Sequence, residues 1–187
     1  MHTPFSFVVK QFSSSARSLR HTRTLTTTGV LLAIQMVLSS YGTIEVTDSL
    51  KISLAHLALA PTAVFFGPVV AGMQGALSDI LALAIKPTGP YFPGFTLSAM
   101  LLGLFYGLAL YKTKRKLWQV VAVRLAVMVI INIGLNTLFL TMLYGPSRLV
   151  TLPVRALKNL IQFPADCFLL YSMCRVLYRM PDPLTVR

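Results

Sequence analysis

The stretch PVRALKNLIQFPADCFLLYSMCRVLY, residues 153–178, is long enough to cross a membrane, yet its first half carries several polar and charged side chains. A helix that spans the hydrocarbon core needs about 20 mostly apolar residues. The polar side chains recur at helical spacing, so they fall mainly on one face of the predicted helix. They are Arg155, Lys158, Asn159, Gln162 and Asp166. Because such groups avoid lipid and face a bundle interior or a water-filled cavity, the stretch predicts one wall of a pocket.

The composition of the whole chain agrees with a membrane protein. Hydrophobic residues make up 55% of the 187 residues and charged residues only 12%, about half the share found in soluble proteins. The net charge of +12 does not indicate a nucleic-acid-binding face, because the basic residues flank the apolar runs instead of covering one surface. We therefore expect an integral membrane protein of one domain.

Length and punctuation predict six membrane spans. Gly67-Pro68 is a turn signal between the second and third spans, and Pro153 suits the first turn of the sixth helix. A cleavable signal peptide is the alternative for the first span, but its apolar run is longer than usual and lacks a clear cleavage site. The predicted spans cover 24–42, 52–66, 68–85, 94–111, 118–143 and 153–178.

The positions of the basic residues predict the orientation of these spans, since cytoplasmic segments are enriched in Lys and Arg. Six spans place all the basic clusters on one side of the membrane. We therefore predict an all-α membrane protein with six transmembrane helices, both termini cytoplasmic, in the plasma membrane. Tails 1–23 and 181–187 flank the transmembrane domain, residues 24–180. The clusters are Lys10, Arg17, Arg20 and Arg23; Lys112, Lys114, Arg115 and Lys116; and Arg175, Arg179 and Arg187.

The predicted outer loops are more elaborate than the cytoplasmic turn at Gly67-Pro68. Alternating β-branched residues over 43–47 predict a short strand in the first loop, 40–51. The second loop, 86–95, is rich in Pro, Gly and aromatic residues, and the third covers 144–153. These loops favour a lid or binding mouth on the outer face, with ordinary connectors as the alternative.

Further polar and aromatic residues are candidates for the same pocket. Asn132 and Asn136 lie one turn apart in the fifth span, and Phe139 continues their face. Aromatic rings offer a stacking surface, amides read ring edges and cations hold carboxylates, so the pocket suits a planar polar molecule with an anionic end. The aromatic candidates beside the second outer loop are Tyr91, Phe92 and Phe95.

Three ionisable residues allow two interpretations. Asp79 and Asp166 either contribute to function or pair with a basic side chain that ties helices together. His56 is more often a packing or interfacial residue than a ligand. Cys167 and Cys174 lie in an apolar helix and are interpreted as buried thiols without a metal.

Motifs of catalysis and energy use are missing from the sequence. It contains no GxxxxGK[ST] phosphate loop, no HExxH and no GxSxG. We therefore expect neither an enzyme nor a cofactor or metal site. A channel would need polar residues through the full depth of several helices, and the absence of an internal repeat disfavours a typical secondary transporter.

Small residues recur four apart in several spans, a pattern that lets helices approach closely. Most such pairs pack within the bundle, although the pair on the first span could equally dock a partner helix. The pairs are Gly29 and Ala33, Ala71 and Gly75, Gly72 and Ala76, and Gly103 and Gly107.

These features together resemble the substrate-binding S components of energy-coupling factor (ECF) vitamin transporters, over about residues 24–180. The stretches GALSDILALAIKPTGPYFPGF, NIGLNTLFLTMLYG and LPVRALKNLIQFPAD resemble the folate-specific members. S components also carry an Ala-x-x-x-Ala pattern that docks a membrane-embedded T component. Here the corresponding residues are Gly29 and Ala33, so glycine replaces the first alanine.

The resemblance implies high-affinity capture of a vitamin from outside and delivery inward by toppling, together with a T component and two cytoplasmic ATPases that hydrolyse the ATP. For folate, we expect the pterin near Asn132, Asn136 and Gln162. Arg148, Arg155 and Lys158 are the candidates for the carboxylates. The alternatives are an S component for hydroxymethylpyrimidine or pantothenate, or a non-transport membrane scaffold or enzyme.

Overall fold

The computed structural model describes residues 4–41, 43–47, 50–53, 55–86, 90–111, 117–145 and 152–179. Within these ranges, only the backbone is described for residues 4–7, 41–56, 152, 154–155 and 178. In chain order the elements are α1 (Pro4–Ser18), α2 (Thr22–Tyr41), β1 (Thr43–Thr47), β2 (Leu50–Ser53), α3 (Ala55–Phe65), α4 (Pro68–Ile85), α5 (Pro93–Leu110), α6 (Leu117–Ala126), η1 (Val127–Leu135), α7 (Asn136–Tyr144) and α8 (Leu152–Arg179).

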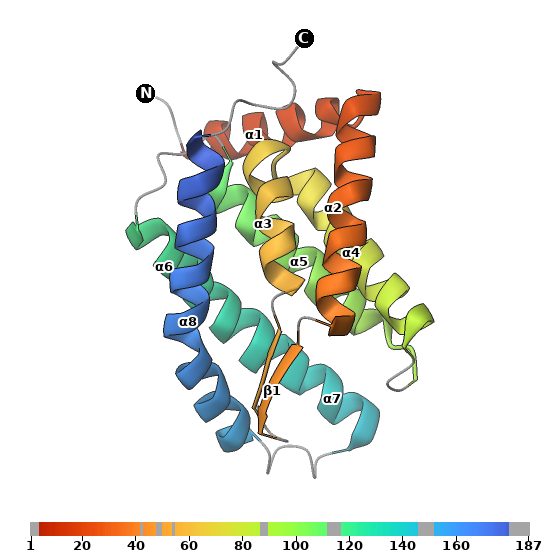
Figure 1. Ribbon diagram of the computed structural model, residues 1–187, viewed down its shortest axis with the longest axis vertical. Helices are drawn as coiled ribbons and strands as arrows, with labels where there is room; N and C mark the ends of the chain where they lie inside the picture. Colours follow the sequence, from red (N-terminus) through yellow and green to blue (C-terminus); the bar gives the residue numbers. More distant parts are fainter. Residues whose placement is uncertain are drawn as a thin grey trace.

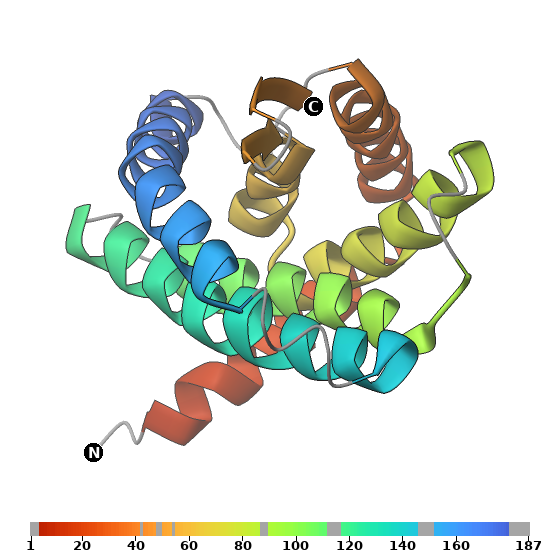
Figure 2. The same ribbon diagram turned by 90° about the horizontal axis from the view of Figure 1, so that it is seen from below.

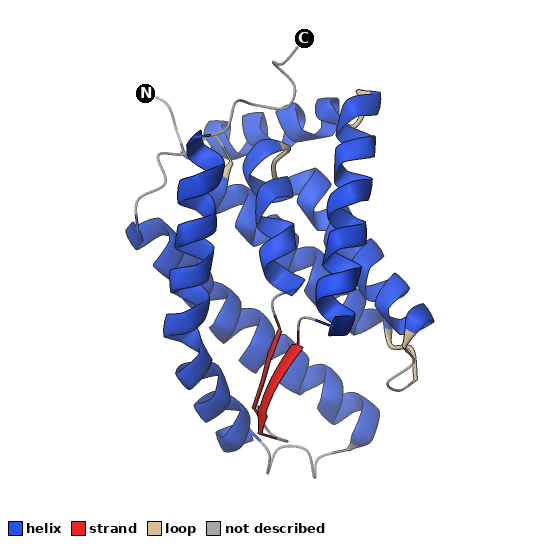
Figure 3. Ribbon diagram, viewed as in Figure 1, coloured by secondary structure: helices blue, strands red, loops and turns tan. Residues whose placement is uncertain are grey.

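The helices form a bundle with distinct ends (Figure 1). Helix α1 lies across one end, where the C-terminal end of α8 also lies, and the two strands lie towards the other end (Figure 3). Seen from below, α3 lies between α2 and α8, and the long helix formed by α6, η1 and α7 runs along α5 (Figure 2). This arrangement places α1 and the end of α8 on the same side of the bundle.

A helix is present in each of the six predicted spans. The third prediction, 68–85, coincides with α4, and the fifth corresponds to α6, η1 and α7 in one continuous run. Among the described residues, four helices are long and apolar enough to cross a membrane. They are Pro68–Ile85, Pro93–Leu110, Leu117–Tyr144 and Ala156–Leu177. Helix α2 is not among them, and α3 has only 11 residues.

The short helix α3 forms the centre of the core. Leu59, Ala60 and Ala63 are fully buried, and they belong to a cluster that extends to α5, α6 and α8. An 11-residue helix is only about 16 Å long, roughly half the hydrocarbon thickness. The predicted span 52–66 is therefore wrong at its start, because Ile52 and its neighbours pair with β1 instead of entering the helix.

The strand predicted over 43–47 is confirmed as β1, which pairs antiparallel with β2. The register joins Ile44 to Ile52 and Glu45 to Lys51, with an irregularity between Glu45 and Thr47. The architecture is therefore helical with one added two-stranded hairpin, where the sequence predicted helices and a single short strand.

Glycines bring α4 and α5 into backbone contact. A Cβ built on Gly75 would overlap the carbonyl group of Ala99, and one on Gly103 would overlap that of Ala71. A Cβ on Gly107 would overlap the backbone of Pro68. For these helices the small residues spaced four apart are confirmed as packing within the bundle.

A buried chain of amides and a hydroxyl joins three helices. Thr62 of α3 donates a hydrogen bond to Gln74 Oε1, and Gln74 Nε2 donates to Gln35 Oε1 of α2 over 2.9 Å. All three side chains are at least 93% buried. Because buried polar groups are costly unless they are paired, this chain fixes α2 against α3 and α4.

Candidate functional site

A cavity of about 360 Å³ opens where α4, α5 and α7 meet. Its described lining includes Asp79 of α4, Tyr91 and Phe92 before α5, Phe95 of α5 and Tyr144 of α7. Three of the predicted site residues, Tyr91, Phe92 and Phe95, therefore line one cavity. Most of the remaining lining is leucine, so the cavity is apolar with one acidic group.

Three predicted residues form an aromatic cluster, which consists of Phe92, Phe95 and Phe139. The ring centroids of Phe92 and Phe95 are 5.8 Å apart, and Phe139 lies 5.6 Å from Phe92 and 6.3 Å from Phe95. These tilted and edge-to-face arrangements are the favoured ones for aromatic pairs. The cluster joins α7 to the start of α5 and offers flat apolar surface beside the cavity.

The sequence Pro93-Gly94-Phe95 allows the three rings of the aromatic cluster to pack together. Pro93 starts α5, and its fixed backbone angle suits the first helical position. Gly94 follows, and a Cβ built there would lie 2.8 Å from Cγ of Phe139 and would overlap the ring of Phe92. Gly94 thus leaves the space that the rings occupy.

Asp79 supplies the acidic group of the cavity. Thr96 Oγ1 donates a hydrogen bond of 2.7 Å to Asp79 Oδ2, and it also lies 3.4 Å from the hydroxyl of Tyr91. The carboxylate is half-buried and is held by α5 from the side. Asp79 therefore lines the cavity, and the described residues place no basic side chain in an ion pair with it.

The two predicted asparagines lie where the helix type changes. Asn132 is inside the π-helix η1 and Asn136 is the first residue of α7; both are half-buried. The side-chain oxygen of Asn136 is enclosed, yet it has no hydrogen-bond partner among the described residues. Short π-helical segments occur frequently at functional sites, and an enclosed acceptor without a partner can receive a ligand's N–H group.

The polar residues predicted on the sixth span belong to α8, and their place in a pocket stays a prediction. Lys158, Asn159 and Gln162 are half-buried. Only the backbone of Arg155 is described, and Arg148 lies outside the described residues. The described lining of the cavity comes from α4, α5, α7 and the segment before α5, and it includes no residue of the α8 row.

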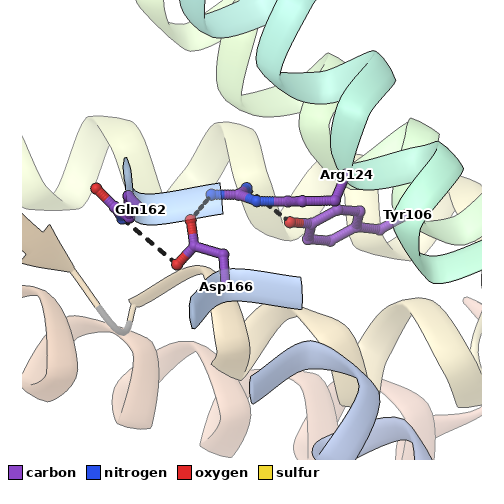
Figure 4. Close-up of polar contacts among 4 residues, drawn as sticks. All are labelled: Tyr106, Arg124, Gln162 and Asp166. Carbon is purple, nitrogen blue, oxygen red and sulfur yellow. Dashed lines mark hydrogen bonds and ion pairs between the residues drawn. The ribbon is translucent and has the colours of Figure 1, made fainter. Parts of the chain in front are cut away.

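Below that row, Asp166 forms an ion pair with Arg124 of α6, shown in Figure 4. The guanidinium of Arg124 also donates a hydrogen bond of 3.0 Å to the hydroxyl of Tyr106 on α5. Gln162 Nε2 lies 3.4 Å from the second carboxylate oxygen of Asp166. Arg124 is 7% exposed, Asp166 1% and Tyr106 0%, so the network is buried between three helices.

This network settles the role that the sequence left open for Asp166, since the carboxylate ties helices together. Removing one partner of a buried ion pair costs about 3–5 kcal/mol, because the other charge is left uncompensated. The sequence analysis missed Arg124 and Tyr106. The available signal was a single arginine inside the apolar run VVAVRLAVMV, which flanking clusters of basic residues do not explain.

The remaining predicted residues fall away from the cavity. Gly29 and Ala33 are exposed on α2, and a Cβ built on Gly29 would meet no described atom within 4 Å. Cys167 and Cys174 are buried free thiols, as predicted. The side chain of His56 is not among those described. No group of three or more potential metal-ligating His, Cys, Asp or Glu side chains occurs among the described residues.

Comparison with known proteins gives a consistent result. Residues 23–173 match the family described as ECF transporter, substrate-specific component. A folate transporter FolT from Clostridium novyi (strain NT) is 31% identical over 150 residues, which cover 80% of this chain and 87% of the relative. A folate transporter FolT from Leuconostoc mesenteroides subsp. mesenteroides is 35% identical over 158 residues, covering 81% and 84%.

A solved structure of FolT bound with folic acid is also similar. It is 34% identical in sequence and superimposes with a TM-score of 0.76, covering 86% of this chain and 97% of that structure. The similarity thus extends over most of this chain and nearly all of that structure.

Proposed function

Since the chain belongs to the family of substrate-specific components of ECF transporters, we propose that it is the membrane-embedded subunit that captures folate for import. The observation that carries this proposal is the match to FolT bound with folic acid, which is 34% identical and nearly completely covered. The aromatic cluster and the polar row of α8 agree with it, because folate combines a flat pterin with a carboxylate tail.

We place the pterin between the aromatic cluster and the amides of Asn132, Asn136 and Gln162. The rings of the cluster offer stacking surface, and the enclosed oxygen of Asn136 is an acceptor for the N–H groups on the edge of a pterin. Tyr91 lies at the mouth, where it is 54% exposed. A flat heteroaromatic ring can thus stack on the aromatic cluster and form hydrogen bonds with the amides along its edge.

We assign the glutamate tail of folate to the cationic side of the pocket. Arg148, Arg155 and Lys158 are the residues that pair with its carboxylates, with Asn159 beside them. Arginine binds carboxylates through two parallel hydrogen bonds, which gives geometric selectivity as well as attraction. Lys158 and Asn159 are half-buried near the start of α8, at the end of the bundle where the strands lie.

The topology that suits this role has six spans with both termini in the cytoplasm. The helices α2 to α8 supply the spans, with α6, η1 and α7 as one, and the hairpin then belongs to the outer face. Both α1 and the end of α8 lie at one end of the bundle, which supports an even number of crossings (Figure 1).

The chain supplies binding, and its partners supply the energy. We propose that ATP is hydrolysed by two cytoplasmic ATPases and that a T component docks on the exposed face of α2 around Gly29 and Ala33. This face is open to a partner helix, because both positions are exposed and nothing described covers Gly29.

The test is equilibrium binding of folate to the purified protein without its partners. We expect micromolar or tighter binding, and retention of folate when the protein is purified from cells. No detectable binding, with hydroxymethylpyrimidine, pantothenate or another vitamin retained instead, would contradict the substrate assignment while leaving the family unchanged.

A further inference from the structure

Helix α1 packs on the bundle through its polar side. Gln11 Nε2 donates a hydrogen bond of 2.9 Å to the carbonyl oxygen of Tyr111, and Ser15 Oγ donates one of 2.6 Å to that of Phe66. Ser15 Oγ also accepts from the backbone N–H of Val69 over 3.0 Å. Ser15 thereby caps the end of α3 and the start of α4, where helices leave backbone groups without partners.

The apolar side of α1 consequently points away from the protein. Val8 is 38% exposed and Val9 50% exposed, Ala16 is exposed and Phe12 is half-buried. Val9, Phe12 and Ala16 are spaced three and four apart, so they share one side of the helix. A helix on a water-soluble protein buries its apolar side, whereas α1 buries Gln11 and Ser15. Lipid is the medium in which this reversal is stable.

The position of α1 agrees with a membrane surface. It lies across the end of the bundle while α2 and α8 run lengthwise (Figure 1). Viewed from below, its N-terminal part extends beyond the neighbouring helices (Figure 2). In the proposed topology this end is cytoplasmic, so α1 lies in the plane where lipid headgroups meet the acyl chains.

A basic groove follows α1 at its junction with α2. It encloses about 590 Å³ and is lined by Ser13, Ala16, Arg17, Arg20 and His21. Backbone hydrogen bonds fix the junction, since Arg20 N–H donates to the carbonyl of Arg17 and His21 N–H donates to that of Ser18, each over 3.1 Å. Two guanidinium groups and a serine hydroxyl thus line one ordered concavity.

We propose that this groove binds the phosphate headgroup of an anionic phospholipid in the cytoplasmic leaflet, while Val8, Val9 and Phe12 contact its acyl chains. Arginine pairs with phosphate through two hydrogen bonds, and each basic residue near an anionic leaflet contributes about 1 kcal/mol of attraction. An acidic segment of a partner protein would complement the arginines but not the exposed valines. The combination of both surfaces on α1 and its junction with α2 favours lipid.

The inference rests on the proposed topology but not on the substrate. Helix α1 precedes residue 23, where the family match begins, so the features that indicate folate binding do not include it. Folate affinity of the variants below is expected to be unchanged, which separates a failure of the lipid site from a failure of the proposed function.

The first experiment measures phospholipid retained by the full chain. The protein is purified after equilibration with phosphatidylcholine containing a minority of phosphatidylglycerol, and bound lipid is identified by native mass spectrometry. The double variant R17Q/R20Q is expected to bind phosphatidylglycerol about tenfold more weakly or worse. The matched control R175Q/R179Q removes two exposed arginines from the C-terminal part of α8 and is expected to retain it.

Three outcomes would overturn the lipid site. They are unchanged phosphatidylglycerol binding by R17Q/R20Q, an equal loss in the control, or unchanged lipid binding with loss of the T component from the purified complex. The last would indicate that the groove docks a protein. Because all four arginines are exposed, thermal unfolding of both variants is expected to match the parent protein.

A second experiment tests the depth of α1. Cys167 and Cys174 are buried, so a fluorophore can be placed selectively at Val9→Cys on the apolar side or Ser13→Cys in the groove. In vesicles containing phosphatidylglycerol, a lipid-soluble quencher is expected to act mainly on position 9 and an aqueous quencher mainly on position 13. Quenching of both positions from water alone would contradict an in-plane helix.

Discussion

At Gly103 an added Cβ would overlap the carbonyl group of Ala71, whereas at Gly29 it would meet no described atom within 4 Å. Both glycines belong to small residues spaced four apart in apolar helices. On α5 the small residues contact the backbone of α4, so a larger side chain would overlap it. On α2 the same pattern faces outward, in a position open to another helix.

The same small-residue pattern can serve packing within the bundle or contact with a partner, and the burial of the glycines distinguishes the two uses. Gly75, Gly103 and Gly107 are obligatory for the fold, because backbone atoms of a neighbouring helix occupy the space a side chain would need. Gly29 and Ala33 serve no packing role visible in the described residues, which supports their proposed use at a subunit interface. Substitutions on the two sides should therefore affect different properties.

The largest effect on stability is expected for the buried ion pair of Arg124 and Asp166, which belongs to the closely packed interior. Asp166→Ala leaves Arg124 buried without its partner, so we expect a loss of about 3–5 kcal/mol in unfolding free energy. The measurement is unfolding by heat or denaturant in detergent. Stability equal to that of the parent protein would show that the network in Figure 4 does not hold the helices together.

The second prediction applies one substitution to both sides of the comparison. Gly103→Ala forces α4 and α5 apart and is expected to cost about 1–3 kcal/mol. Gly29→Ala has open space around it and gains helix propensity, so it is expected to be neutral or stabilising by up to about 1 kcal/mol. Thermal unfolding of the pair checks both signs, and equal shifts would remove the distinction between the two surfaces.

A third prediction concerns a glycine surrounded by rings instead of backbone. Gly94→Ala displaces Phe92 and Phe139, which are side chains and can shift, so stability should fall by no more than about 1 kcal/mol. Folate affinity should fall about tenfold, because the aromatic cluster loses its arrangement. The measurement is folate titration beside thermal unfolding. Ala99→Gly, at a contact of α5 with α4, is the control and should leave folate affinity unchanged.

The last prediction concerns Gly29→Leu, which is exposed and, like Gly29→Ala, is expected to be neutral or stabilising by up to about 1 kcal/mol. Folate binding by the solitary protein should be unchanged. Assembly is the discriminating measurement, because a leucine at this position holds a partner helix away. Unchanged copurification with the T component and ATPases would place the interface elsewhere.

The parts of the fold that follow from local sequence were predictable. Runs of apolar residues between glycine and proline fixed the position of α4, and β-branched alternation predicted β1. Phe92, Phe95 and Phe139 were all named as site candidates, although their contact with one another was not predicted. These features depend on periodicity and turn chemistry, which the chain carries at short range.

Features that depend on distant partners were not predictable to the same extent. A basic partner for Asp166 was one of two interpretations, but its identity as Arg124 required the packing of α6 against α8. The π-helix η1 has no marker in the sequence, and it changes the spacing on which the faces of Asn132 and Asn136 were assigned. The buried face of α1 consists of glutamine and serine. Hydropathy alone therefore does not predict that this segment packs on the bundle, and it was predicted only as a tail.

The buried chain from Gln35 through Gln74 to Thr62 has a mechanical consequence for transport. It attaches the inward face of α2 to α4 and α3, while the outward face has open space around Gly29. In the proposed assembly, a force that the T component applies to the outward face of α2 is therefore transmitted to α3 and α4 through these side chains.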